Sequence, residues 1–101
     1  MKLFNNNIRN NVNVSLRKSI HHPLHKMLRD ALIDKRKELN LTQRDLAKKL
    51  NVTHSVVGKI ETGDRRLDIV EFFEYSNALD MVATETLTIL FNNYKTSLKR
   101  M

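Results

Sequence analysis

The stretch from residue 41 to residue 63 places the tightest constraint on the fold of this chain. It holds two short segments whose apolar residues recur at helical spacing, separated only by Asn51 and Val52. Thr42 and Asp45 supply the Ser/Thr-x-x-Asp/Glu pattern that caps the start of a helix. Two helices joined by so short a turn cross at a steep angle. The sequence therefore predicts a tightly packed helix pair at the centre of the chain.

We expect these two helices to cover residues 42–49 and 53–62, with Thr53 as the cap of the second one. Ala47 is small enough for a close crossing, and Val57 and Ile60 supply the inward face of the second helix. Gly63 is expected to end that helix in a left-handed conformation.

Three further helices are predicted, over residues 23–39, 68–79 and 84–97. Pro23 suits a first helical position, and Asp68 with Glu71 repeats the capping pattern. The expected inward faces of the last two helices are Ile69, Val70, Phe73, Ala78 and Leu79, then Leu87, Leu90, Phe91, Tyr94 and Leu98. With two Gly and one Pro, turn residues are too scarce for an all-β fold. We expect an all-α, compact bundle of five helices.

Charge is unevenly distributed along the chain, whose net charge is +7. Residues 1–22 carry four basic residues and no acidic one, and six of the first thirteen residues are Asn. We expect a flexible basic arm there, with a short strand over residues 12–16 as an alternative. Residues 23–66 hold eleven basic against six acidic residues, whereas residues 67–83 hold four acidic and no basic residue. A basic face of this kind suits a phosphate backbone, although ordinary solubility explains the charge equally well.

Several classes of protein find no support in the sequence. The chain has no Cys, so disulfides and zinc sites with cysteine ligands are excluded, and a reducing cytoplasm is allowed. It has no apolar run of about 18 residues and no signal peptide, so no membrane partner is expected. His21 and His25 are four residues apart, but no Cys, Asp or Glu lies near them before Asp30, so no metal is expected. Nucleophile-elbow, phosphate-loop and paired-carboxylate patterns are absent, so we expect neither an enzyme nor a cofactor.

Residues 24–80 resemble the Xre family, the lambda-repressor-like helix-turn-helix domains. The resemblance depends on a set of matching positions: Leu41, Thr42, Gln43, Leu46, Ala47, Asn51, Val52, Thr53, Val57, Lys59, Ile60, Glu61, Gly63, Asp64, Arg65, Arg66, Leu67, Asp68, Val70, Glu71 and Phe72. It implies a DNA-binding domain over residues 23–83, with residues 84–101 as a C-terminal helix that can serve in dimerisation. It also implies that the second helix of the pair enters the major groove. Gly58 departs from the family, in which Ser is frequent there, and the arm is longer than in many members.

The resemblance also implies roles for single residues. His54, Ser55 and Lys59 match base-reading positions, with Val56 a lesser candidate. Gln43, Thr53 and Thr62 match positions that contact the DNA backbone, and Arg36 with Glu61 matches a structural ion pair between helices. Lys59 can donate to guanine, and Ser55 can pair with several bases, which agrees with these roles. Arg44, Arg65 and Arg66 are chemically suited to phosphates.

The expected function is sequence-specific DNA binding that regulates transcription, most simply as a repressor. The expected partners are double-stranded DNA with a two-fold operator and a second copy of the chain. The basic arm is a candidate for extra phosphate or minor-groove contacts. Two alternatives stay open: an antitoxin that represses its own operon and binds a toxin protein, and a protein-interaction adaptor that has lost DNA binding. The apolar stripe of residues 84–98 either completes the monomer core or forms a dimer interface.

Overall fold

The computed structural model describes residues 20–99, and within that range the chain forms five helices and no strand. Their bounds are α2 Pro23–Glu38, α3 Gln43–Leu50, α4 His54–Thr62, α5 Ile69–Ala78 and α6 Ala83–Lys99. All five predicted helices are therefore present, and no end differs from its predicted position by more than two residues. The predicted strand over residues 12–16 lies outside the described residues, as does most of the predicted arm.

Local capping explains where most of these helices begin and end. The Thr42 hydroxyl accepts from the Asp45 backbone N–H at 3.0 Å, and the Asp45 carboxylate accepts from the Thr42 backbone N–H at 2.9 Å. Asp68 and Glu71 form the same reciprocal box at the start of α5. Three helix ends use a left-handed Asn or Asp instead of Gly: Asn40, Asn51 and Asp80, with φ near 57°, 56° and 54°. These residues replace the glycines that the sequence lacks.

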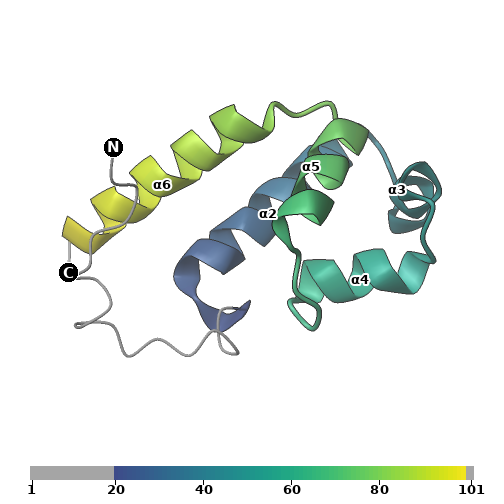
Figure 1. The fold of residues 1–101 in the computed structure, drawn as a ribbon, viewed down its shortest axis with the longest axis horizontal. Coiled ribbons are helices and arrows are strands. Elements are labelled where there is room, and N and C mark those ends of the chain that lie inside the picture. The colour runs from purple at the N-terminus through teal and green to yellow at the C-terminus, as the bar shows by residue number, and fades with distance from the viewer. Residues whose placement is uncertain (1–19, 100–101) are drawn as a thin grey trace.

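The core forms where α3 and α4 cross. Ala47 is 3% exposed and Val57 is fully buried, which confirms the close crossing expected there. α4 also packs on α2, and α3 packs on α5, so the α3–α4 pair is held from both sides. Figure 1 shows α2 and α6 lying alongside each other at one end of the molecule, with α3 and α4 at the other.

The predicted inward face of α5 is wrong at three positions. Ile69, Val70 and Phe73 are 58%, 60% and 47% exposed. The buried side chains of α5 and its C-cap are Phe72, Tyr75, Ser76 and Leu79. This segment carries two apolar stripes at helical spacing, and the periodicity alone does not decide between them. Contacts with α3 and α6 bury the stripe that carries the larger aromatic surface.

The N-terminal end of the described chain is already part of the fold. The His22 ring accepts from the Leu24 backbone N–H at 3.0 Å, and the Ile20 carbonyl accepts from Arg29 at 2.8 Å. The His22 ring also packs at a tilt against Tyr94 of α6, with ring centroids 5.3 Å apart. The last residues of the predicted arm therefore pack on α2 and α6, and residues 1–19 lie outside the described part.

Helix α6 completes the monomer core along part of its length. Leu90 is 7% exposed and Leu87 packs against the core, whereas Phe91 and Leu98 are 47% and 48% exposed. A hollow of about 360 Å³ remains between α6 and the first turns of α2. No helix between residues 20 and 99 is both long and apolar enough to cross a bilayer.

Candidate nucleic-acid interface

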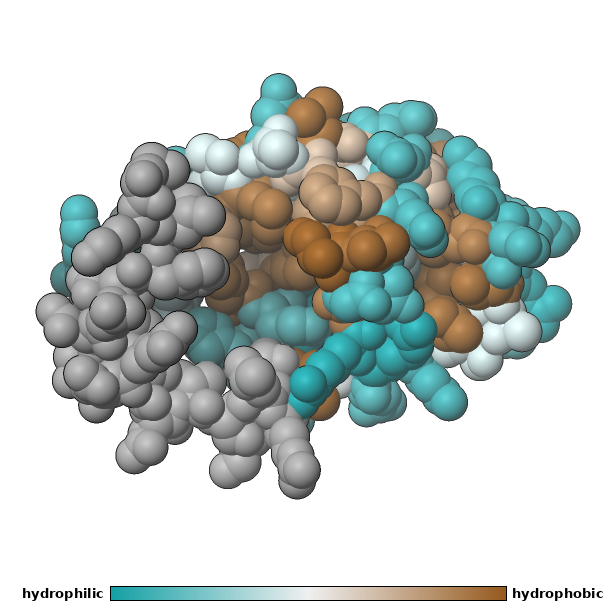
Figure 2. Space-filling view, viewed as in Figure 1, coloured by the Kyte–Doolittle hydropathy of each residue, from teal (hydrophilic) through white to brown (hydrophobic). Residues whose placement is uncertain are grey.

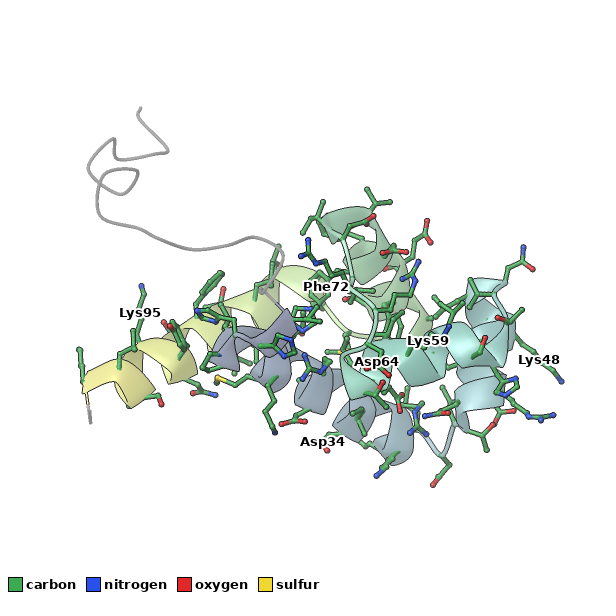
Figure 3. All side chains as sticks on the ribbon, turned by 90° about the horizontal axis from the view of Figure 1, so that it is seen from below. Asp34, Lys48, Lys59, Asp64, Phe72 and Lys95 are labelled. Atoms are coloured by element: carbon green, nitrogen blue, oxygen red, sulfur yellow. The ribbon has the colours of Figure 1, made fainter. Side chains whose placement is uncertain are left out.

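Helix α4 presents one buried face and one polar, solvent-exposed face. Val57 is fully buried and Ile60 is 3% exposed, which fixes the rotation of the helix. His54, Ser55 and Lys59 are exposed on the other side, as predicted. Figure 3 looks at this side of the molecule, with Lys59 on α4 and Lys48 at the edge formed by α3. The three strongest base-reading candidates therefore share one accessible surface.

Val56 and Thr53, near the start of α4, are placed differently from what the sequence suggested, which was base reading for Val56 and capping for Thr53. Val56 is half-buried and packs against the core, so it does not share the outer face. Thr53 occupies the N-cap position, but its side chain makes no capping hydrogen bond. Its hydroxyl lies 3.0 Å from the Ser55 hydroxyl instead. The first backbone N–H groups of α4 consequently lack a side-chain cap, and such groups are favourable partners for a phosphate.

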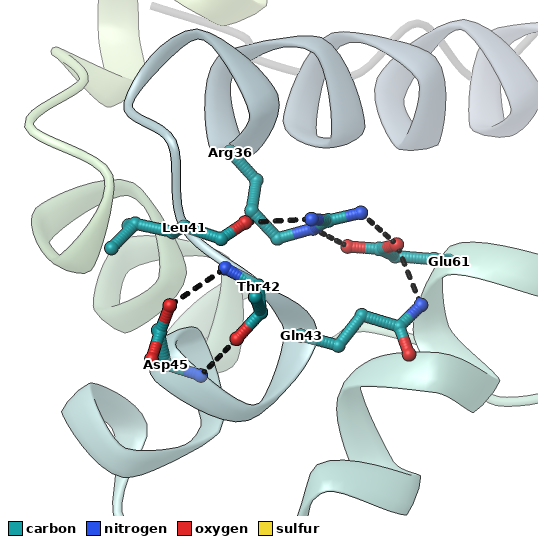
Figure 4. A network of polar contacts seen from close by, with 6 residues as sticks. All are labelled: Arg36, Leu41, Thr42, Gln43, Asp45 and Glu61. Carbon is teal, nitrogen blue, oxygen red and sulfur yellow. Dashed lines mark hydrogen bonds and ion pairs between the residues drawn. The ribbon is translucent and has the colours of Figure 1, made fainter.

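A buried polar network ties α4 to α2 and α3 (Figure 4). Arg36 and Glu61 form a two-point ion pair at 2.6 and 3.0 Å, which confirms the predicted pairing. The Arg36 guanidinium also donates to the Leu41 carbonyl at 2.7 Å. Gln43 donates its amide N–H to Glu61 at 3.0 Å. Glu61 thus receives hydrogen bonds from two helices, and this fixes the C-terminal half of α4.

The ion pair is nearly inaccessible to water. The side chains of Arg36 and Glu61 are 10% and 7% exposed. The hydrogen bonds that Arg36 donates to Glu61 raise the pKa of Arg36 above its ordinary value, despite the opposing effect of burial. Charged partners that are this well buried favour a single geometry, because separating them leaves an uncompensated charge.

The predicted phosphate-binding residues lie on α3, at the start and end of α4 and in the loop that follows α4. They differ in whether another residue of the protein already binds their side chain. Arg44 is exposed on the first turn of α3, and Arg66 is exposed in the α4–α5 loop. Arg65 instead donates to the Glu71 carboxylate at 2.7 Å, which raises the pKa of Arg65 and lowers that of Glu71. The Thr62 hydroxyl lies within 3.2 Å of the Lys59 carbonyl and 3.1 Å of Asp64. Arg44 and Arg66 are therefore the two arginines of this set that no ion pair holds within residues 20–99.

The sequence did not point to Arg29, which contacts the C-terminal end of α4. Gly63 is buried with φ of 86°, and a Cβ built there would meet the Arg29 guanidinium carbon at 2.8 Å. A guanidinium at this place faces the negative end of the helix dipole. The same side chain holds the Ile20 carbonyl and lies 2.6 Å from His25 Nδ1. Arg29 thus joins the start of the described chain to the end of α4.

The histidines near the start of α2 have protein partners. His25 faces Arg29, and His22 caps α2. Between residues 20 and 99 no group of three or more potential ligands is placed to hold a metal ion.

An exposed polar helix face, held by a second short helix at a steep crossing, defines a helix-turn-helix protein. A family model described as Helix-turn-helix matches residues 32–87, which is more than half of the chain. The chain belongs to this family, in its XRE branch. Members of the family are DNA-binding regulators, and this places the chain among DNA-binding transcription regulators.

A solved structure supports this assignment, and a second one shows the same fold. The XRE-family like protein from Pseudomonas syringae pv. tomato str. DC3000 is 32% identical, with a TM-score of 0.69. That similarity covers 75% of this chain and 93% of the other. The clp gene regulator ClgR from C. glutamicum is 21% identical, with a TM-score of 0.61 over 69% of this chain and 91% of that one, and shows the shared fold. No curated protein matches the sequence.

Proposed function

We propose that this chain is a sequence-specific transcriptional repressor that places α4 in the major groove of a two-fold operator. One observation carries the proposal: His54, Ser55 and Lys59 are exposed on a helix whose other face is buried. Side chains held this way can reach base edges without a change in the fold. Lys59 donates to guanine O6 or N7, and Ser55 pairs with several bases.

Phosphate contacts would set the position of α4 on the duplex. Gln43 lies at the start of α3 and supports α4 through Glu61. Its amide group is therefore coupled to the position of the reading helix, and a phosphate bound there would fix both. Arg44 on α3 and Arg66 in the loop after α4 supply exposed guanidinium groups. Thr53 and Thr62, at the two ends of α4, supply hydroxyls. Arg65 joins this set once it exchanges Glu71 for a phosphate.

A repressor of this kind, encoded by a bacterium or a phage, would act as a homodimer in the cytoplasm and would associate with the nucleoid when bound to DNA. Two copies would read half-sites about 10 base pairs apart, or a multiple of that distance. The predicted minor-groove contacts of the arm fall on residues 1–19, outside the described part. Binding of a toxin protein, the antitoxin alternative, would use a surface away from α4.

Selection of bound sequences from a random DNA pool, at stated salt, tests the proposal. We expect a two-fold consensus, because base contacts and not phosphate contacts carry sequence information. A Ser55→Ala, Lys59→Ala double variant should bind with relaxed sequence preference and keep the wild-type unfolding curve. The matched control is Lys95→Ala, since Lys95 is an exposed lysine on α6 at the other end of the molecule (Figure 3). A double variant that selects the wild-type consensus would exclude base reading by these residues.

A further inference from the structure

The exposed stripe of α5 is an apolar surface that the proposed function does not use. Ile69, Val70 and Phe73 are 58%, 60% and 47% exposed and lie on the first turns of the helix. Figure 2 shows apolar side chains gathered at the middle of one face, over α5. Three large apolar residues grouped on a surface are typical of a protein interface.

The charged residues around this stripe are of both signs. Arg66 precedes it in the α4–α5 loop, and Glu74 follows it on α5. Both side chains are exposed, and neither forms a salt bridge with any residue from 20 to 99. The other charged residues of this segment are already engaged: Asp68 caps α5, and Glu71 holds Arg65.

The order of these residues is self-complementary. Arg66 and Glu74 are equally distant from Val70 along the chain, on opposite sides of it. A two-fold axis at Val70 would set two α5 helices antiparallel, with Arg66 of each copy facing Glu74 of the other. In this dimer Arg66 is engaged by Glu74, so the arginine contacts to phosphate would fall to Arg44 and Arg65. Interfaces with two-fold symmetry require such self-complementarity, because the same patch meets itself.

We propose that a second copy of this chain docks on α5, with Val70 at the two-fold axis, Phe73 packed against its counterpart's stripe and two Arg66–Glu74 pairs at the rim. The inference rests on the proposed function, since a two-fold operator requires a two-fold protein. It moves the dimer interface from α6, where the sequence suggested it, to α5. The physical reason is that α6 spends Leu87 and Leu90 on the monomer core, and its exposed Ile89 and Phe91, two residues apart, do not share a face of the helix.

The position of α5 suits a DNA-bound dimer. It begins directly after the loop that leaves the C-terminal end of α4. A contact through α5 would relate the two α4 helices by the same two-fold axis. The buried Arg36–Glu61 pair and Arg29 hold α4 on α2, and α3 packs on both α4 and α5. A contact through α5 would therefore set the spacing of the two reading helices.

Cysteine cross-linking tests the interface directly, because the chain contains no Cys of its own. Val70→Cys should form a disulfide-linked dimer under mild oxidation, since residues at a two-fold axis come within the Cβ separation a disulfide needs. Ile89→Cys on α6 is the matched control, with Ile89 59% exposed against 60% for Val70. We expect at least tenfold more dimer from the first variant. Equal yields, no dimer from either, or a higher yield from Ile89→Cys would overturn the proposal.

Two further comparisons use sedimentation of the free protein. Phe73→Ser should weaken dimerisation at least tenfold, whereas Phe91→Ser on α6, with the same 47% exposure, should leave it unchanged. The charge reversals Arg66→Glu and Glu74→Arg should each weaken the dimer, and combining them should restore it. A dimer lost with Phe91→Ser but kept with Phe73→Ser would assign the interface to α6 and overturn the proposal.

DNA binding is measured separately, on a duplex at low salt. If the wild-type protein binds a selected sequence but the Val70→Cys variant forms no cross-linked dimer, the α5 interface is refuted and the proposed function stays intact. A cross-linked dimer that binds no DNA at any salt concentration would refute the proposed function and leave the interface intact.

Discussion

At the scale of single residues, Glu61 is the point where α2, α3 and α4 meet. It accepts from Arg36 at two points and from Gln43 at a third. The sequence suggested the Arg36 pairing by resemblance, but the bond from Gln43 emerged only in the folded chain. This bond links a predicted phosphate-binding residue to the end of the reading helix.

We expect Glu61→Ala to lower the free energy of unfolding by about 3 kcal/mol, because Arg36 would remain as a buried charge without its partner. Urea unfolding measures this loss. Asp30→Ala is the control, since it breaks the Lys26–Asp30 pair, whose side chains are 68% and 54% exposed. Exposed pairs contribute less than about 1 kcal/mol. Equal losses in the two variants would contradict the structural role given to Glu61.

His25 gives the fold a predicted dependence on pH. Burial, and then the neighbouring Arg29 and Arg66, lower the pKa of His25 from its ordinary value of 6.5. As pH falls below that value, the unfolded chain binds a proton that the folded chain does not, so stability falls. Unfolding free energies at about pH 7.5 and about pH 5.5 should differ less in His25→Gln than in wild type. His54→Gln, at an exposed position, should retain the wild-type difference, and a His25→Gln variant that also retains it would refute this assignment.

At the scale of elements, the two glycines on and after α4 should respond in opposite ways to Ala. A Cβ at Gly58 would meet only the Gln43 amide oxygen, at an ordinary 3.5 Å. Gly58→Ala should therefore stabilise the protein by about 1 kcal/mol, the helix propensity difference. Gly63→Ala should destabilise it by about 2 kcal/mol, through left-handed strain and the collision with Arg29. Thermal unfolding of both variants checks the signs, and a stabilising Gly63→Ala would exclude the close approach of Arg29.

The N-cap residues Thr42 and Thr53 allow an effect on stability to be measured apart from an effect on DNA binding. Thr42→Ala removes a capping bond of α3 and should lower stability by about 1 kcal/mol. Thr53→Ala removes no capping bond, so its stability should stay within about 0.5 kcal/mol of wild type. Its DNA affinity should still fall if Thr53 contacts the backbone. Urea unfolding and DNA titration on the same two variants give both quantities, and a large stability loss in Thr53→Ala would argue for a cap formed in solution.

At the scale of the whole molecule, exposed positive charges lie both beside α4 and far from it. Lys48 lies beside α4, and Lys95 lies far from it on α6 (Figure 3). If α4 enters the groove, Lys48 lies near phosphates and Lys95 does not. The overall charge of +7 would then matter less than its position.

Salt dependence of DNA binding measures this difference. Lys48→Gln should reduce the slope of log affinity against log salt by about 0.9, the value for one phosphate contact on duplex DNA. Lys95→Gln carries the same change of net charge and should leave the slope unchanged. Equal slopes for the two variants would show that long-range charge, and not contact, controls binding.

The sequence by itself determined the five helices, the Ala47 crossing and the outer residues of α4, because capping patterns and helical periodicity act over a few residues. For α5 it predicted Ile69, Val70 and Phe73 to face inward, and they do not, since two apolar stripes compete there and only packing against α3 and α6 selects one. It also gave no sign of Arg29 over Gly63, because that contact joins positions distant in the chain. The tertiary structure decided both, and in doing so it left Ile69, Val70 and Phe73 on the surface, where burial in the monomer no longer accounts for them.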